Sequence, residues 1–212
     1  MEVTVRNTRI EDYESIAELQ MKVYPGIRPW TSEQIESHIK MFEEGQFVAE
    51  YDGRIVGTSS SFIILWDEYG IDHNWREVTG YGKFSTHNPE GKTLYGAEVC
   101  VDPSYQKKGI GHALYTARRN LCKRLNLKRI IAAGRLPNYY IYSDEMSPEL
   151  YAMKVIWGDI YDPVLRFQIG EGFQFCGIVE NYLHGDKESL EFASLIVWIN
   201  KDYNPEAKKG TN

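Results

Sequence analysis

Cysteine is scarce in this chain, positive charge is outnumbered, and no long apolar run occurs. There are 3 cysteines in 212 residues, and Cys100, Cys122 and Cys176 lie far apart, which indicates reduced thiols in a cytoplasmic protein rather than a disulfide framework. The formal net charge of -6 disfavours a nucleic-acid surface. No segment is apolar for long enough to cross a bilayer, and the N-terminus lacks the apolar core of a signal peptide, so we predict no membrane association.

The overall composition of the chain is that of a globular domain. Hydrophobic residues make up 42% of the chain, which argues against disorder. The length is sufficient for one substantial core. Because no internal repeat and no shift in composition marks a boundary, we predict a single domain over residues 1–200 and a polar tail over 201–212.

The most informative stretch is AEVCVDPSYQKKGIG, which begins at Ala97. Val99 and Val101 fall on one side of an alternation. Glu98 and Cys100 fall on the other side, and this period of two predicts a strand with two different faces. The Asp-Pro pair that follows ends the strand, because proline has no amide to give to a neighbouring strand.

A turn rich in lysine and glycine follows this strand and leads into a helix. Gly109 and Gly111 allow the backbone to turn tightly and to approach a ligand without an intervening side chain. Unpaired amides at the helix start and the positive end of the helix dipole favour an anion, and Lys107 and Lys108 add charge beside them. The turn therefore predicts a phosphate or pyrophosphate site. The alternative is a glycine-containing turn without a ligand.

Two common phosphate-binding motifs do not fit this turn. A dinucleotide fingerprint needs a third glycine, and Leu114 stands at that position. An ATP-type loop needs Gly-Lys-Ser/Thr, which is absent. The pattern Val-x-Pro-x-x-Gln-x-x-Gly-x-Gly on a strand, loop and helix resembles instead the acetyl-CoA loop of the GNAT superfamily of N-acetyltransferases. The matching residues are Val101, Pro103, Gln106, Gly109 and Gly111.

The elements predicted elsewhere agree with this resemblance. Residues 3–6 alternate as a first strand, and Thr8 and Glu11 have the spacing of a capping box before a helix. Further predicted elements are a helix after a Thr31–Gln34 capping box, a hairpin about Asp52-Gly53, a helix over 110–125, a parallel strand over 129–133, helices that begin at Ser147 and Asp162, and two C-terminal strands after Gly172-Phe173.

The resemblance covers most of residues 1–200 and implies an α/β (α+β) fold. About seven mostly antiparallel strands with a central splayed parallel pair would be flanked by helices. It implies acetyl-CoA as cosubstrate and a small-molecule or peptide amine as acceptor, and it leaves a homodimer open. Residues 136–139, 146–149 and 162–165 also resemble the acetyltransferase half of bacterial proteins that fuse this domain to a nitrilase-like hydrolase, of which the chain would be a stand-alone relative.

The resemblance also assigns roles to the strand and the turn. Backbone groups near Val99 to Val101 would bind the pantetheine arm, and one amide there would serve as an oxyanion donor. The residues expected to contact the cosubstrate are Val99, Val101, Gln106, Lys107, Lys108, Gly109, Ile110 and Gly111. A binding module that keeps this loop without the chemistry, such as an acyl-CoA sensor, is the alternative to an enzyme.

Glu98 is the candidate general base, because its strand passes the expected position of the acetyl group and an ammonium acceptor must lose a proton before it attacks. An edge or surface glutamate is the alternative. Cys100 has no identifiable base beside it, so direct transfer is favoured over an acyl-enzyme. His112, just inside the helix, is expected to fill space, with a contact to the cosubstrate as the alternative.

The proton for the leaving thiolate has no obvious source. Many GNAT enzymes place a tyrosine four residues before a Gly-Phe pair, but here Gln168 stands four residues before Gly172. A glutamine cannot act as an acid. Either water supplies the proton or another tyrosine does. Tyr139 is the candidate, with Tyr151 and Tyr161 as rivals, and each is alternatively a packing residue.

The sequence also predicts roles for two loops and for one face of a helix. Residues 67–92 and 135–146 are rich in aromatics and are predicted to wall the acceptor site, or else to cover a sheet edge. His73 and His87 have no metal-binding spacing, so no metal is predicted. On the predicted helix over 110–125, the basic face is predicted to be solvated, with a contact to the CoA nucleotide as the alternative. Its members are Arg118, Arg119, Lys123 and Arg124.

Overall fold

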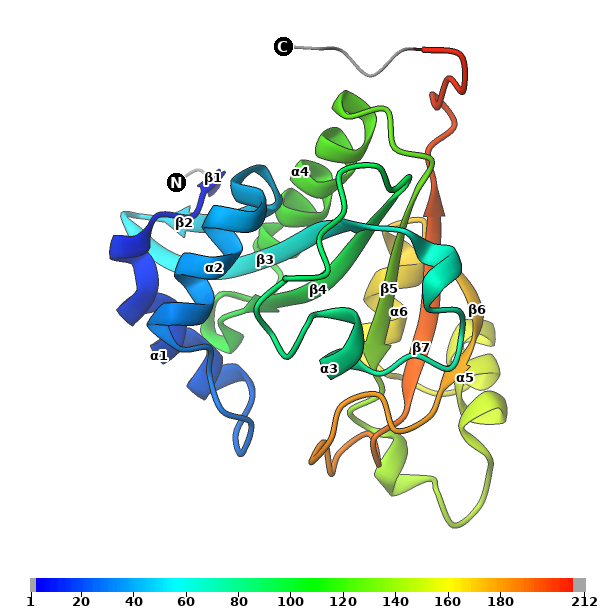
Figure 1. Ribbon diagram of the computed structural model, residues 1–212. Helices are drawn as coiled ribbons and strands as arrows, with labels where there is room; N and C mark the ends of the chain where they lie inside the picture. Colours follow the sequence, from blue (N-terminus) through cyan, green and yellow to red (C-terminus); the bar gives the residue numbers. More distant parts are fainter. Residues whose placement is uncertain (1–2, 208–212) are drawn as a thin grey trace.

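A seven-stranded sheet runs through the molecule, in the strand order β1-β2-β3-β4-β5-β7-β6 (Figure 1). The computed structural model describes residues 3–207. The β4–β5 pair is parallel and the other neighbouring strands are antiparallel, which confirms the predicted mixed sheet with a central parallel pair. The strands are β1 (Val3–Asn7), β2 (Gln46–Tyr51), β3 (Arg54–Ile64), β4 (Thr93–Val101), β5 (Arg129–Arg135), β6 (Gln174–Val179) and β7 (Ala193–Ile199).

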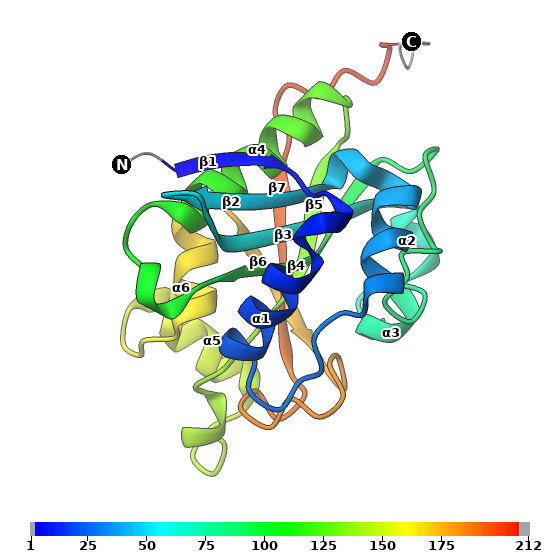
Figure 2. The same ribbon diagram turned by 90° about the vertical axis from the view of Figure 1, so that its left-hand side faces the viewer.

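Helices cover both faces of this sheet (Figures 1 and 2). Their bounds are α1 (Tyr13–Val23), α2 (Ser32–Phe42), α3 (Trp75–Val78), α4 (Ile110–Arg124), α5 (Pro148–Trp157) and α6 (Pro163–Gly170). One face is buried beneath α1 and α2, in a core that includes Ile16, Ile35 and Tyr95. The other is buried beneath α4, α5 and α6, in a core that includes Leu94, Leu121 and Leu165. Within residues 3–207, no helix combines the length and the apolar character that a bilayer span requires.

Local sequence signals account for most element boundaries. Asp52 and Gly53 both adopt positive φ angles, of 54° and 72°, as a two-residue hairpin turn between β2 and β3 requires. The capping box at the start of α2 is confirmed, because the Thr31 side chain accepts from the amide of Gln34. Ser147 likewise accepts from the amide of Leu150 at the start of α5.

The predicted capping box of Thr8 and Glu11 is wrong by one residue. The Thr8 amide still donates to the Gln46 carbonyl of β2, at 3.0 Å, so the chain has not yet left the sheet edge. Asp12 closes the first turn instead, where its carboxylate accepts from the Arg9 amide at 2.8 Å. The guanidinium of Arg6 holds the same carboxylate at 2.7 Å, and this ion pair favours Asp12 over Glu11 as the capping residue.

The beginning of the C-terminal tail is attached to the end of α4. Asn126 adopts a left-handed φ of 48° as predicted, and its side-chain amide donates to the Asn204 carbonyl at 2.8 Å. The Asn204 amide donates back to the Asn126 side chain at 2.9 Å. The division into a domain over 1–200 and a tail over 201–212 stays a prediction, and its last residues, 208–212, lie outside the described part of the chain.

Candidate active site

The parallel strands β4 and β5 separate halfway along their length, and this gap is the centre of the candidate site (Figure 1). They pair from Thr93 opposite Arg129 to Gly96 opposite Ala132. Beyond Gly96, β4 continues alongside β3 alone, and beyond Ala132, β5 continues alongside β7 alone. Backbone groups on the facing edges of the two strands are therefore left without a strand partner.

A β-bulge lies where the separation begins. Ser61 of β3 pairs with Gly96, but the next residue, Ser60, pairs with Glu98, so Ala97 is an extra residue in β4. Past the bulge, the Asp102 amide donates to β3, at 2.8 Å from the Val56 carbonyl. Because the backbone groups of alternate residues point the same way, the amides of Val99 and Val101 face away from β3 and into the gap.

Aromatic side chains from two other segments bind the open edge of β4. The Tyr24 hydroxyl, just after α1, donates to the Val99 carbonyl at 2.8 Å. The Trp75 indole N–H, at the start of α3, donates to the Ala97 carbonyl at 3.2 Å. The guanidinium of Arg135, at the end of β5, lies 5.6 Å from the Tyr24 ring centroid. Tyr24, Trp75 and Arg135 therefore line the mouth of the gap on the α1/α2 side.

The turn between β4 and α4 has the backbone of an anion site. Lys107 and Gly109 both adopt left-handed φ angles, of 61° and 79°. Across the described chain, no hydrogen bond occupies the amides of residues 107–111, and they stand at the positive end of the 15-residue helix α4. A Cβ at Gly109 would meet nothing within 4 Å. The space in front of the turn is thus open to a ligand.

The side chains at this turn contribute less than its backbone. The ammonium of Lys108 lies over the rings of Tyr51 and Tyr105, 4.7 and 5.4 Å from their centroids, and Lys107 is exposed. Gly111 faces a protein neighbour, since a Cβ there would lie 2.9 Å from the ring of Phe167 on α6. The lack of a side chain at Gly111 therefore serves helix packing as well as any ligand.

Glu98 is half-buried on the α1/α2 side of β4. The Thr58 hydroxyl, on β3, is 2.9 and 3.1 Å from the two carboxylate oxygens. Burial raises the pKa of Glu98 above its ordinary value, although the hydrogen bonds from Cys100 and Thr58 oppose that rise. The thiol of Cys100 is buried beside this carboxylate, and burial holds its pKa well above the usual range. Cys100 therefore stays a thiol at neutral pH.

Arg118 contradicts the prediction of a solvated basic face on α4. Only 1% of Arg118 is exposed. Its guanidinium reaches the bulge, where Nε donates to the Ser61 hydroxyl at 2.8 Å and Nη2 donates to the carbonyls of Ser60 and Glu98 at 3.1 and 2.8 Å. These contacts give the carbonyls beside the bulge a buried donor. Gly96 leaves room for the guanidinium, since a Cβ there would lie 2.8 Å from Nη1.

The three candidate tyrosines for the leaving-group proton lie in other surroundings. Tyr139 is 4% exposed, and its hydroxyl donates to the Met146 carbonyl at 3.1 Å. The Tyr151 hydroxyl donates to Asp162 at 2.8 Å, and Tyr161 is exposed at the surface. The acid role of Tyr139 stays a prediction, but the hydrogen bond that its hydroxyl makes is with its own loop.

The aromatic segment 67–92 packs largely as a cover over the α1/α2 side of the sheet. Phe84 is completely buried and stacks on His38, with ring centroids 3.7 Å apart. His73 bonds to the Tyr95 hydroxyl at 2.8 Å. His87 accepts from the Ile63 amide at 3.2 Å. Most of the segment therefore fits the cover that was the alternative, while Trp75 is the residue that reaches the gap.

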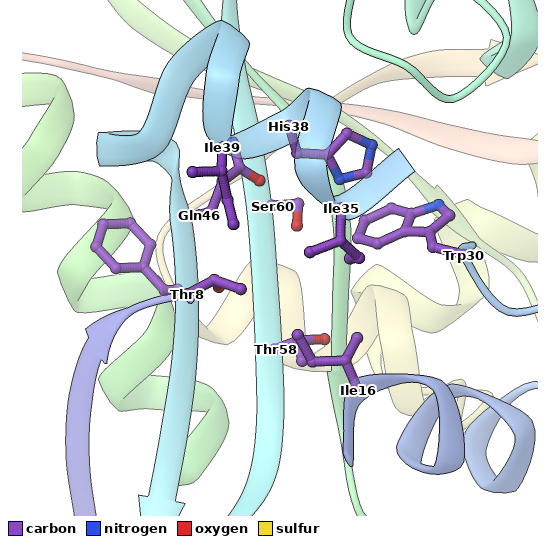
Figure 3. A pocket seen from close by; sticks show the side chains of 10 residues that line it. Thr8, Ile16, Trp30, Ile35, His38, Ile39, Gln46, Thr58 and Ser60 are labelled. Atoms are coloured by element: carbon purple, nitrogen blue, oxygen red, sulfur yellow. The ribbon is translucent and has the colours of Figure 1, made fainter. Parts of the chain in front are cut away.

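A separate small cavity lies under α1 and α2 (Figure 3). Its volume of about 10 Å³ is room for at most one water molecule. Thr58 and Ser60 line it, as do His38 and Gln46, which each carry a buried polar atom without a partner in the described chain. Burial lowers the pKa of His38 to about 4, so this imidazole is neutral. The cavity is too small for a substrate.

Comparison with known proteins identifies the family. The model described as "Acetyltransferase (GNAT) family" matches residues 13–140, which include the gap and the turn. The chain belongs to the GNAT acetyltransferase family. This membership supports acyl transfer as the reaction class and a CoA-type cosubstrate.

Relatives of this GNAT chain agree with the assignment. It is 45% identical over 207 residues to the probable hydrolase YhcX of Bacillus subtilis (strain 168), covering 98% of this chain but only 40% of that relative's length. It is 37% identical over 205 residues to the uncharacterized N-acetyltransferase YkwB of the same organism, covering 95% of this chain and 90% of YkwB. This chain therefore spans less than half the length of the first relative.

Solved structures show the same fold. The loading GNATL domain of CurA from Lyngbya majuscula superimposes on this GNAT chain with a TM-score of 0.82 at 22% identity, covering 94% of this chain and 98% of that domain. At this identity the likeness concerns the fold alone, and the predicted GNAT fold is confirmed.

Sequence reasoning missed Arg118 and Tyr24 in this GNAT site. A signal for Arg118 was present, because it stands four residues after Leu114 and three before Leu121, in phase with the buried stripe of α4. No comparable signal marks Tyr24, whose contact with Val99 joins residues 75 positions apart. Such a contact depends on how α1 docks on the sheet.

Proposed function

We propose that this protein is an N-acetyltransferase that moves an acetyl group from acetyl-CoA to a primary amine by direct transfer. The observation that carries the proposal is the gap between β4 and β5, which opens beside an anion-binding turn at the start of α4. A thioester with a long polar arm and a pyrophosphate matches both features. The gap offers unpaired amides to the arm, and the turn offers unpaired amides to the phosphates.

The residues of the turn fit a pyrophosphate. The amides of residues 107–111 and the left-handed backbone at Gly109 form the cradle, and its open front leaves space for the phosphate oxygens. The residues that would contact the cosubstrate remain those expected from the sequence: Val99, Val101, Gln106, Lys107, Lys108, Gly109, Ile110 and Gly111. The cosubstrate supplies an activated acyl group.

Glu98 is proposed as the general base. It lies directly after the bulge, on the strand that edges the gap, and its raised pKa brings its basicity closer to neutral pH than that of a free glutamate. Hydrogen bonds from Thr58 hold the carboxylate in one orientation. The amide of Val99 or Val101 is proposed as the oxyanion donor, because both face the gap. Because Cys100 is held as a buried thiol, direct transfer is favoured over an acyl-enzyme.

The acceptor is proposed to enter on the α1/α2 side, between Tyr24, Trp75 and Arg135. Arg135 is already paired with the carboxylates of Asp186 and Glu188, so its charge is neutralised and the mouth retains an acidic excess. An acidic mouth attracts an ammonium group before deprotonation. A primary amine on a small molecule or a peptide fits these surroundings.

The test combines a binding measurement with turnover. Calorimetric titration with acetyl-CoA is expected to give saturable binding at one site. A panel of primary amines, including polyamines, amino acids and lysine peptides, is expected to contain at least one acceptor that releases CoA thiol and whose turnover falls on the order of 10²-fold or more in Glu98→Gln. Binding without turnover of any amine would favour a non-catalytic acyl-CoA sensor, and absence of binding would refute both.

A further inference from the structure

A buried phenol and a buried amide meet between α4 and α6. The Gln168 side-chain amide donates to the Tyr115 hydroxyl at 3.3 Å. Tyr115 is 3% exposed and Gln168 is 5% exposed. The Tyr115 ring packs edge-on against Phe167 and Phe173, with centroids 5.1 and 5.4 Å away. This pair is therefore a polar contact among aromatic rings.

The pair lies at the β5 edge of the gap. A Cβ at Gly134 would lie 2.3 Å from Oε1 of Gln168, so the amide rests directly against the backbone of β5. Gly134 comes two residues after Ala132, where the pairing of β5 with β4 ends. The amide and the phenol therefore stand under the separated part of the strands.

Tyr115 also lies between the anion turn and the closed end of the gap. Gly111, Tyr115 and Arg118 follow one another on α4 at spacings of four and three residues, which places them on one stripe of the helix. Gly111 stands at the turn, and Arg118 reaches Gly96, where β4 and β5 are still paired. Tyr115 is midway along this stripe.

The hydrogen bonds of this pair leave one polar group without a partner. Among the described residues the side chains of Tyr115 and Gln168 bond only to each other, and in either orientation of the amide one donor or acceptor of the pair is left over. Oε1 of Gln168 is buried without a partner in the described chain. Buried polar groups are nearly always paired, and an unpaired one costs about 1–3 kcal/mol. Such a pair is expected where a ligand completes the bonding.

Cations beside Tyr115 oppose the effect of its burial. Burial and, to a smaller extent, the Glu171 carboxylate raise the pKa of Tyr115 above its usual value, whereas the Arg118 guanidinium, 5.5 Å from the ring centroid, and the amide of Gln168 act to lower it. Both groups would stabilise the phenolate that remains after the proton has left. No equivalent cation is among the interactions that set the pKa of Tyr139, where burial and Glu149 both raise it.

We propose that Tyr115, oriented by Gln168, donates the proton to the sulfur of the leaving thiolate. The inference rests on the proposed function. The carbon–nitrogen bond forms as the carbon–sulfur bond breaks, the Tyr115 proton goes to sulfur to give CoA thiol, and the amine proton goes to Glu98. When the products leave, the phenolate takes a proton from solvent water and Glu98 returns its proton to solvent, so both groups are reset. Tyr115 then takes the role that the sequence suggested for Tyr139.

Binding measurements can test this contact without any acceptor. CoA and desulfo-CoA, which lacks the sulfur, are titrated calorimetrically into the wild type, Tyr115→Phe and the matched control Tyr139→Phe. Loss of one hydrogen bond is worth about fivefold in affinity. The wild type and Tyr139→Phe are expected to prefer CoA by about that factor, and Tyr115→Phe is expected to bind both ligands equally.

A rescue variant extends the test to turnover. With an acceptor from the amine panel, Tyr115→Phe is expected to lower kcat on the order of 10²-fold at unchanged KM for acetyl-CoA. Adding Gln168→Tyr is expected to restore part of that loss, because it returns a hydroxyl to the same contact. If Tyr115→Phe does not fold, Gln168→Leu keeps the phenol and is expected to weaken the preference for CoA.

The outcomes separate this inference from the proposed function. If the wild type binds neither ligand, the proposed function fails, and this inference fails with it. If the wild type binds CoA but Tyr115→Phe keeps the full preference over desulfo-CoA, only the role of Tyr115 is overturned. Loss of the preference in Tyr139→Phe would assign the proton to Tyr139 instead.

Discussion

The two faces of β4 beyond its bulge carry opposite chemistry. On the α1/α2 side, Glu98 and Cys100 present a carboxylate and a thiol whose pKa values are both raised. On the α4/α6 side, Arg118 and Tyr115 present a cation and a phenol. Amide formation from a thioester needs one proton removed at nitrogen and one supplied at sulfur. Because β4 lies between them, the carboxylate of Glu98 and the phenol of Tyr115 cannot exchange a proton directly.

Removal of the carboxylate is expected to have the largest effect. Glu98→Gln keeps the shape and loses the base, so kcat is expected to fall on the order of 10²- to 10⁴-fold, with acetyl-CoA affinity changed less than about twofold. In the wild type the rate is expected to rise with pH and level off above the raised pKa of Glu98, because only the carboxylate accepts a proton. If the rate of Glu98→Gln still rises with pH in the same way, a group other than Glu98 is responsible for that rise.

Removal of the buried cation is expected to have the second largest effect, on stability. Arg118→Met leaves the carbonyls of Ser60 and Glu98 without their donor, and the free energy of unfolding is expected to fall by about 2–4 kcal/mol. Urea denaturation at pH 7 measures the change. Arg124→Met is the matched control, because Arg124 lies on the same helix with a side chain that is 58% exposed, and it is expected to lose less than about 1 kcal/mol. Equal losses would show that Arg118 has no special part in the bulge.

The anion turn allows a comparison of backbone with side chain. Gly109→Val forces a branched side chain into a left-handed backbone and into the open front of the turn, so CoA affinity is expected to fall at least about tenfold. Lys108→Ala removes an ammonium that rests on Tyr51 and Tyr105, and a change of less than about threefold is expected. Calorimetry measures the CoA affinity of both variants. If Lys108→Ala loses more affinity than Gly109→Val, the lysine side chains rather than the backbone amides hold the phosphates.

The smallest effect is expected at the mouth of the gap. Trp75→Phe keeps an aromatic ring and removes the N–H that bonds the Ala97 carbonyl at 3.2 Å. The KM of the acceptor is expected to rise about threefold, while the affinity for acetyl-CoA stays the same, because Trp75 lies on the acceptor side only. If both constants are unchanged in a folded variant, the segment 67–92 is structural cover along its whole length.

The elements that could be predicted from the sequence depend on neighbours along the chain. The alternation at Val99 and Val101, the hairpin at Asp52-Gly53 and the glycine turn are local patterns, and the structure has each of them where it was expected. Arg118 was misplaced because a charge on a helix is usually solvated, and only the bulge above it provides carbonyls for a buried guanidinium.

The polar contacts of the site depend on packing between distant elements. Gln168 and Tyr115 are 53 residues apart, and they meet only because α6 docks against α4 beneath the gap. The sequence showed that Gln168 stands where a tyrosine was expected, but it did not show which hydroxyl lies beside it. Tyr139 was chosen from its place after β5, and that place says nothing about the direction of its side chain.

The extra residue at Ala97 changes the face of the sheet on which the following side chains of β4 lie. Before it, Leu94 packs toward α4 and Tyr95 toward α1 and α2. Strict alternation from there would turn Glu98 toward α4. Since three residues of β4 stand against two of β3 here, Glu98 emerges with Thr58 on the α1/α2 side and Val99 packs toward α4. Deletion of Ala97 would therefore exchange the two faces of the rest of β4. The Glu98 carboxylate would then lie in the apolar layer under α4, and Val99 and Val101 would face the acceptor. A residue without a reactive group thus decides on which side of the sheet the base is found.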